Sequence, residues 1–263
     1  MLLAAAFYYL GERDMKIITW NLNGLLSSVQ NDVFADIAAL EPDILCLQEI
    51  RTQQEPVILP GYHHYWNHGE RDGYSGTAVL SKKKPLEVIC GAGTEADEEG
   101  RVLTLAFPEC FIVNAYAPNS QQNLQRRAYR LNWDTQFYQY AGELMEERPV
   151  IICGDFNVTR RELDIYAENQ RQVWAQMGYA SDERSNLESF LEMGFTDVFR
   201  HLYPDRRSYT WWSNRLNKRR ENRGWRLDYF FVSDDLLFDV ERMDHLEDVH
   251  GSDHCPVLLE VSV

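Results

Sequence analysis

Several features that would assign the chain quickly to a class are missing. The five cysteines include no CxxC pair, which excludes a zinc site built from paired thiolates. No glycine- or proline-rich linker, low-complexity tract or heptad repeat interrupts the sequence, so separate domains or a coiled coil are not indicated. The apolar start MLLAAAFYYL has only ten residues, lacks a basic residue and is followed by GERD, so it is too short to cross a bilayer. We therefore expect no membrane partner.

Positive charge is scarce as well. The chain has 26 Lys and Arg against 41 Asp and Glu, which gives a formal net charge of -15. A negative field repels phosphate, so the composition taken alone argues against a membrane surface and against nucleic acid. A nucleic-acid partner would therefore require a local basic surface.

The 263 residues do contain enough apolar material for a sizeable core, with 44% hydrophobic and 13% aromatic residues. Nine short apolar runs predict strands: KIITWNL, DILCLQE, TAVLSK, LEVICG, RVLTLAF, CFIVNAY, PVIICGDFN, RLDYFFVS and CPVLLEV. Helical patterns fall at 29–40, 125–147 and 185–193, and the last opens with Ser185 and Glu188 spaced as in a capping box. These strands are more than one sheet comfortably holds, so we expect a single mixed α/β domain over residues 15–263.

Residues 1–14 would then form an extension that is disordered, a small appended helix, or the product of an upstream start codon before Met15. Four cysteines, Cys46, Cys90, Cys110 and Cys153, lie in or beside apolar runs, where cysteine behaves as a small hydrophobe. This cysteine usage indicates a reducing, intracellular compartment, namely the cytoplasm, with nucleoid association if the source is bacterial.

Polar side chains recur where the strand runs end. Asp and Asn are common turn formers and a lone histidine is more often structural, so each residue taken singly has a simpler explanation. An acid after ILCLQ must nevertheless be paired, solvated or metal-bound, and so many functional groups at strand ends indicate a site. The residues are Asn21, Glu49, Tyr116, Asp155, Asn157, Asp228, Asp253 and His254.

The chemistry of this set favours a hard cation. Oxygen ligands without paired Cys or a second clustered His suit Mg²⁺, with Mn²⁺ as a substitute, far better than zinc. Mg²⁺ held by carboxylates keeps waters and binds substrate phosphate, and it neutralises charge as the phosphorus becomes five-coordinate. The residues therefore predict phosphoester hydrolysis with one or two ions.

The same residues lie in eight motifs, which are WNLNG, LCLQE, GYSG, EEGR, NAYAPN, CGDFNV, GWRLDYF and GSDHCP. In order and spacing these motifs resemble the exonuclease III type of apurinic/apyrimidinic endonucleases, within the DNase I-like phosphoesterase superfamily. The resemblance implies a four-layer α/β sandwich, with two packed mixed β-sheets flanked by helices. It also implies a monomer that cleaves double-stranded DNA 5′ to abasic sites with Mg²⁺, and that has 3′→5′ exonuclease and 3′-phosphatase or 3′-diesterase activities.

The resemblance also implies roles at the metal. Glu49 is the principal ligand, with support from Asn21 and Asp253. Asp155 orients or deprotonates the attacking water and Asn157 fixes it, and a second ion on these two residues is one alternative. The full set of candidate ligands is Asn21, Glu49, Asp155, Asn157, Asp253 and His254.

Other residues are expected at the phosphate. His254 would contact the scissile phosphate with its tautomer fixed by Asp228, so we expect the carboxylate nearest its ring to be Asp228 and not Asp253. Tyr116 would contact the phosphate or help the leaving oxygen to depart. Which of Asp155, Tyr116 and His254 moves the proton is left open.

Recognition of an abasic site needs a pocket that accepts a flipped-out sugar and rejects a base. Trp211, Trp225 and Leu227 match the family's apolar pocket, although they could also be core residues, and Asn119 is expected at the DNA. A charge run is usually a solvated face, but beside this pocket it indicates a phosphate-contacting loop, which answers the objection from net charge. The basic residues are Arg215, Lys218, Arg219, Arg220, Arg223 and Arg226.

Four departures from the family pattern affect substrate contacts and leave the catalytic residues intact. Where relatives have an arginine after the NG of the first motif, this chain has Leu25, Leu26 and Ser27, and where they have glycine and arginine after APN it has Ser120, Gln121 and Gln122. The Ala-His pair after DFNV is replaced by Thr159 and Arg160, before Arg161, and an Asn-Pro-Lys segment further on is missing. We expect hydrolysis to persist, with a shifted preference among abasic sites, 3′-blocked ends and 3′ exonuclease substrates.

Other classes of protein share part of this pattern. A DNase I-like phosphoesterase of inositol phosphates or sphingomyelin would share the metal site, although GWRLDYF and GSDHCP favour the DNA-repair branch. A catalytically weak DNA-binding paralogue would be expected to have lost part of the constellation, which is complete in this chain. A structural Ca²⁺ domain is disfavoured because no compact DxDxDG loop occurs.

Overall fold

The computed structural model describes residues 14–93, 95–121, 124–166, 179–214 and 218–263, which form two six-stranded sheets. Sheet A has the order β11 (Val240–His245), β12 (Val257–Ser262), β1 (Asp14–Asn21), β2 (Ile44–Gln48), β4 (Thr77–Ser81) and β3 (His63–Asn67). Sheet B has the order β5 (Glu87–Cys90), β6 (Val102–Ala106), β7 (Phe111–Tyr116), β8 (Val150–Asp155), β10 (Asp228–Ser233) and β9 (Phe195–Asp197).

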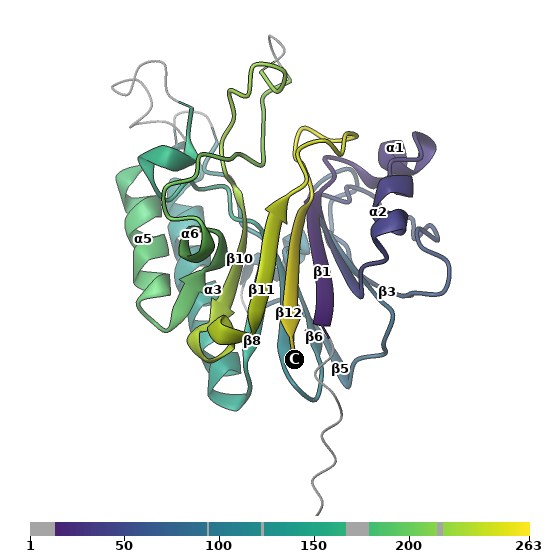
Figure 1. Cartoon of the computed structure of the whole chain (residues 1–263), viewed down its shortest axis with the longest axis horizontal. Coiled ribbons are helices and arrows are strands. Elements are labelled where there is room, and N and C mark those ends of the chain that lie inside the picture. Colours follow the sequence, from purple (N-terminus) through teal and green to yellow (C-terminus); the bar gives the residue numbers. More distant parts are fainter. Residues whose placement is uncertain (1–13, 94, 122–123, 167–178, 215–217) are drawn as a thin grey trace, which may run out of the picture.

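Helices cover the outer faces of both sheets. The α-helices are α1 (Leu25–Gln30), α2 (Ala35–Leu40), α3 (Arg127–Glu147), α5 (Ser181–Leu191) and α6 (Val198–Leu202), with 3-10 turns η1 (Glu95–Glu99), η3 (Glu162–Asp164) and η5 (Asp234–Asp239). In Figure 1, α1 and α2 lie at the right and α3 and α5 at the left, with the sheets between them.

Three apolar clusters hold these layers together. Residues of both sheets, such as Ile17, Cys46 and Cys153, form the cluster between the sheets. Trp133 and Phe190 belong to the cluster that joins α3 and α5 to sheet B, while a third cluster joins α1 and α2 to sheet A. The four-layer α/β sandwich expected from the resemblance is therefore confirmed.

The parallel strand pairs explain where the polar residues gather. Each sheet contains one parallel pair, β1 with β2 and β7 with β8, while the other pairings are antiparallel. Parallel neighbours end at the same edge, so Asn21 pairs with Gln48 at one sheet's edge and Tyr116 with Asp155 at the other's. Gly154 keeps β8 close to β7, because a Cβ there would lie 1.9 Å from the Ala115 carbonyl oxygen.

Several local expectations were wrong. The helix expected at 29–40 is two short helices, and the helix expected from Ser185 is α5, which begins at Ser181. Ser185 is no cap, because its hydroxyl lies in the second turn and donates to the Ser181 carbonyl oxygen at 2.8 Å. Cys90 is exposed on the edge strand β5, unlike the other three cysteines of the apolar runs, which are buried.

Three strands were missed, and each lacks a buried apolar run. β3 and β11 are half-buried edge strands with polar sequences, and β9 has only three residues. β1 begins at Asp14, one residue before the expected boundary, and the rest of the expected extension, 1–13, lies outside the described residues. No helix in the described ranges combines the length and apolarity that a membrane crossing requires.

Candidate active site

Asp155, the last residue of β8, lies at the centre of the polar edge. One of its carboxylate oxygens accepts from the Asn21 side-chain amide at 2.8 Å, and the other from the Asn157 backbone N–H at 2.8 Å. The Nε2 atom of His254 lies 3.9 Å from the oxygen shared with Asn21. The carboxylate is 1% exposed, so amides and an imidazole replace water around it.

Glu49 joins this centre through the same asparagine. The Asn21 amide donates to Glu49 Oε1 at 2.9 Å, while Arg51 pairs with Oε2. Glu49 has a φ of 52°, a left-handed conformation that costs a non-glycine residue about 1 kcal/mol or more. This turn after β2 brings its carboxylate to the edge where Asp155 lies.

Buried amides support the ends of both strand pairs. Gln48 donates to Thr19 at 2.8 Å and to Asn114 at 2.6 Å, so a side-chain hydrogen bond links the sheets beneath the site. Asn157 donates to the Ala117 carbonyl at 2.9 Å and accepts from the Asn119 amide at 3.1 Å. Asn119 therefore orients the Asn157 amide.

His254 takes its carboxylate partner from Asp228, as the sequence predicted. The Nδ1 atom lies 2.8 Å from Asp228 Oδ2, and both side chains are buried. Asp253 points elsewhere, because its two oxygens accept from Asn23 at 3.0 Å and from the Trp211 indole at 3.1 Å. The adjacent pair is thus separated into two environments.

Negative charge exceeds positive charge in this centre. Burial raises the pKa of Asp155 to about 7, with Asp228 and Glu49 adding to the rise against the opposing effect of His254. Burial alone would lower the pKa of His254, but Asp228, Asp155 and Asp253 raise it to about 10, so the imidazole is held protonated. The surplus of acids favours a bound cation.

The donor set fits such a cation. Ligand atoms of Asp155, Asp228 and His254 lie within 4.8 Å of one another, and Asp228 Oδ1 is buried without a hydrogen-bond partner among the described residues. Glu49 adds a carboxylate beside Asp155, and the two are joined by the Asn21 side-chain N–H groups, while the Asn21 amide oxygen accepts from the Asn23 backbone N–H at 2.9 Å. Carboxylate and amide oxygens are the ligands that Mg²⁺ and Mn²⁺ prefer.

Tyr116 lies against an arginine that the sequence marked only as the last residue of the EEGR motif. The Arg101 guanidinium lies 4.6 Å from the centroid of the Tyr116 ring and donates to the Tyr116 carbonyl at 3.0 Å. Burial, with Glu49 adding, raises the pKa of Tyr116 well above its ordinary value, although Arg101 opposes the shift. The phenol therefore keeps its proton at neutral pH.

An apolar surface lies beside His254. The Trp211 and Trp225 rings are 6.1 Å apart at 87°, and the backbone of Trp211 forms bridges to both Trp225 and His254. Leu227 is buried, and Thr210, for which the sequence carried no signal, accepts from the backbone N–H groups of Leu227 and Asp228 at 3.0 and 3.1 Å. Thr210 thereby fixes Asp228 relative to the tryptophans.

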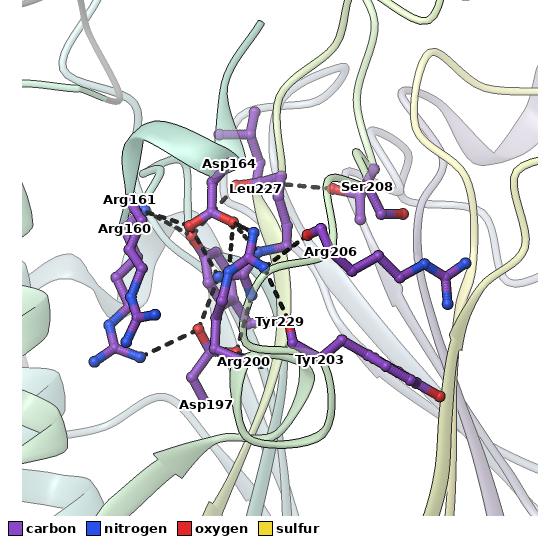
Figure 2. Close-up of polar contacts among 12 residues, drawn as sticks. Arg160, Arg161, Asp164, Asp197, Arg200, Tyr203, Arg206, Ser208, Leu227 and Tyr229 are labelled. Atoms are coloured by element: carbon purple, nitrogen blue, oxygen red, sulfur yellow. Dashed lines mark hydrogen bonds and ion pairs between the residues drawn. The ribbon is translucent and has the colours of Figure 1, made fainter.

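Arg226 is not part of a DNA-contacting surface, contrary to the prediction. It is fully buried and donates to Asp164 at 2.7 Å and to Asp197 at 2.7 Å, while Arg200 also bonds Asp164. Figure 2 shows Asp164 and Asp197 around Arg200 in this ion cluster, which we define as Asp164, Asp197, Arg200 and Arg226. It anchors the segment that leads into Leu227 and Asp228.

Two further arginines of the basic stretch already have partners within the protein, although the sequence predicted that they contact DNA phosphate. Arg219 donates to backbone carbonyls, and Arg223 pairs with Glu221 at 2.9 Å. Lys218 is half-buried and Arg220 is exposed, whereas Arg215 lies outside the described residues.

Most side chains at the positions that depart from the family pattern point into the protein. Leu25 is buried in the core, the Ser120 hydroxyl donates to buried Glu183, and Thr159 is buried. Arg160 pairs with Glu188 at 2.8 Å. The signal for these contacts is absent from the local sequence, because each partner lies on a distant element.

Comparison with known proteins agrees with this geometry. An exodeoxyribonuclease of Bacillus subtilis (strain 168) is 44% identical over 254 residues, which cover 95% of this chain and 100% of that protein. The crystal structure of AP endonuclease LMAP from Leishmania major has a TM-score of 0.88 at 31% identity, covering 95% of this chain and 88% of that one. The structure of the 3′ phosphatase NExo from Neisseria bound to a product DNA hairpin has a TM-score of 0.81 at 26% identity, covering 95% and 100%. Residues 18–254 match the endonuclease/exonuclease/phosphatase family, to which this chain belongs.

Proposed function

We propose that the chain is a Mg²⁺-dependent DNA-repair phosphodiesterase that cleaves double-stranded DNA 5′ to abasic sites and trims blocked 3′ ends. The observation that best supports this proposal is the buried Asp155 carboxylate, which lies between Asn21 and His254 at the polar edge of the two sheets, where acidic groups outnumber cationic ones. The activities named for the similar proteins support phosphodiester cleavage in DNA.

The chain's own residues supply positioning and proton transfer. Asp155, oriented by Asn21 and the Asn157 N–H, accepts the proton of the attacking water. His254, protonated and fixed by Asp228, donates from Nε2 to a phosphate oxygen as negative charge develops there. Tyr116, which keeps its phenolic proton, hydrogen-bonds the phosphate or the leaving oxygen.

Glu49 and Asp155 would hold the metal, with Asn21, Asp228, Asp253 and Asn157 as further candidates. His254, predicted as a ligand, is held protonated with Nδ1 on Asp228, so it has no nitrogen lone pair to offer a metal and acts on the phosphate. Bound Mg²⁺ supplies positive charge that neutralises the phosphate oxygens. Arg51 occupies one oxygen of Glu49, so it must yield that oxygen if the carboxylate binds the ion in bidentate fashion.

Trp211, Trp225 and Leu227 form the proposed site for the abasic sugar, since the two indoles, nearly perpendicular at 87°, offer apolar surface beside His254 against which a flipped-out sugar would pack. The altered loops at Ser120 and Arg160 would shift the preference among abasic sites, 3′-blocked ends and 3′ exonuclease substrates. A monomer would suffice, because all groups of the site come from one chain. The five cysteines are free, which supports a reducing compartment.

An incision assay tests the proposal. Duplexes carrying one abasic analogue, a 3′-phosphate or an ordinary 3′ end would be incubated with the native chain and with His254→Ala, in Mg²⁺ and in EDTA. We expect Mg²⁺-dependent cleavage and a loss of at least about 100-fold in His254→Ala, or about 2.7 kcal/mol of barrier. Cleavage that survives EDTA, or a variant within about threefold of native, would refute the mechanism. An abasic-endonuclease profile without 3′ activity would refute the shifted preference.

A further inference from the structure

Arg219 was expected to contact DNA, yet its guanidinium reaches across to another loop. Nη1 donates to the Ser252 carbonyl at 3.0 Å, and Nη2 donates to the carbonyls of Glu247 and Val249 at 2.9 and 2.6 Å. The same group lies 4.7 Å from the centroid of the Trp212 indole. Arg219 therefore joins the segment after Trp212 to the turn at 247–252.

This turn leads directly into the active site. The Ser252 hydroxyl donates to the Asn21 carbonyl at 2.8 Å and accepts from the His254 backbone N–H at 3.2 Å. The Trp212 backbone N–H donates to the Asp253 carbonyl at 3.0 Å. The backbone of Asp253 and His254 is thus held by β1 on one side and by Arg219 and Trp212 on the other.

The donor count argues against a phosphate contact at Arg219. An arginine side chain has five N–H groups, and three of those of Arg219 donate to carbonyl oxygens, while its Nε atom is buried without a partner among the described residues. Apart from the buried Nε–H, one Nη1 N–H is left, so a phosphate could take at most a single hydrogen bond from this guanidinium without displacing carbonyls of the turn. Arg220, the next residue, is exposed and carries the same charge.

We propose that Arg219 is a positioning residue that fixes the backbone of Asp253 and His254. Its loss then lowers the rate of the chemical step and leaves the affinity for DNA unchanged. This inference rests on the proposed DNA cleavage. A shift of the turn by a fraction of an ångström misplaces the His254 Nε2–H relative to the phosphate, which reduces the rate of the bound complex.

The test separates rate from binding. Arg219→Gln, Arg219→Lys and the matched control Arg220→Gln would be compared by single-turnover cleavage at saturating duplex. Kd would be measured by fluorescence anisotropy in EDTA at several salt concentrations. We expect Arg219→Gln to lower the saturating rate about 30-fold, with Kd within about threefold and an unchanged salt slope. We expect Arg219→Lys to lie between native and Arg219→Gln, since an ammonium cannot reproduce the planar fork.

The control should behave differently. Arg220→Gln should raise Kd and reduce the salt slope by about 1, as expected for a lost phosphate contact. If Arg219→Gln shows that pattern, or leaves both rate and Kd native, the inference is wrong while the proposed function stands. Thermal unfolding identifies a temperature at which every variant is folded, and the Arg219→Lys rate decides the outcome if Arg219→Gln does not fold. A native chain that cleaves none of the duplexes would overturn both proposals.

Discussion

Two buried groups of acids in this chain differ in what balances their charge. In the ion cluster, each of the four carboxylate oxygens of Asp164 and Asp197 accepts from the Arg226 guanidinium. Arg200 also donates to Asp164, and Arg160, outside the cluster as defined, lies 3.6 Å from Asp197. In the candidate active site, Asp155 and Asp228 share one histidine. Acidity alone therefore does not identify a metal site, because a surplus of buried acids over cations is also needed.

The pKa values of Asp164 and Asp155, one acid from each group, are shifted in opposite directions. Burial would raise the pKa of Asp164, but Arg226 and Arg200 lower it to about 2. Burial, Asp228 and Glu49 raise the pKa of Asp155 to about 7 even though His254 opposes them. The ion cluster is complete without a ligand, whereas the site has uncompensated negative charge that a cation would balance.

The largest effect should come from removing the central acid of the site. Asp155→Asn keeps the shape but cannot accept the proton of water, so we expect incision to fall by about 10⁴-fold, or about 5.5 kcal/mol of barrier. The free energy of unfolding in EDTA should not fall, and we expect a rise of about 1 kcal/mol because a buried, poorly balanced charge is removed. Single-turnover incision and urea denaturation at pH 8 measure the two quantities. A variant that is both inactive and markedly less stable would contradict the comparison.

The same Asp→Asn change in the ion cluster should lower the free energy of unfolding, where Asp155→Asn should raise it. Asp164→Asn leaves Arg226 and Arg200 buried with one partner charge fewer, so we expect the free energy of unfolding to fall by about 3 to 5 kcal/mol. Glu162→Gln, an exposed acid on the same turn, is the matched control and should change stability by less than about 0.5 kcal/mol. Urea denaturation measures both variants. Equal effects in the two would show that the cluster is not a balanced ion network.

The sequence predicted which polar strand-end residues lie together better than it predicted the contacts that hold them in place. Asp155 ends one continuously buried strand and Glu49 follows another, and a continuous apolar run can be recognised from the local sequence alone. The role of Arg226 was misjudged because its partners Asp164 and Asp197 lie 62 and 29 residues away. Edge strands such as β3 were missed for a similar reason, since a half-buried strand is stabilised by its neighbour in the sheet more than by its own sequence.

The smallest expected effect is a dependence of stability on pH that comes from Asp164 in the ion cluster. The lowered pKa of Asp164 contributes stability that is fully present above the unfolded value of 3.8 and is lost as the pH falls through about 2. That contribution is about 2 kcal/mol, because each pKa unit corresponds to about 1.4 kcal/mol. Other carboxylates titrate in the same range, so the measured quantity is the difference between native and Asp164→Asn, followed by urea denaturation from about pH 5 to about pH 2.5. We expect the gap between them to narrow progressively below about pH 4, since only the native chain has this carboxylate to protonate. A gap that stays constant over that whole range would mean that the arginines do not hold Asp164 ionised.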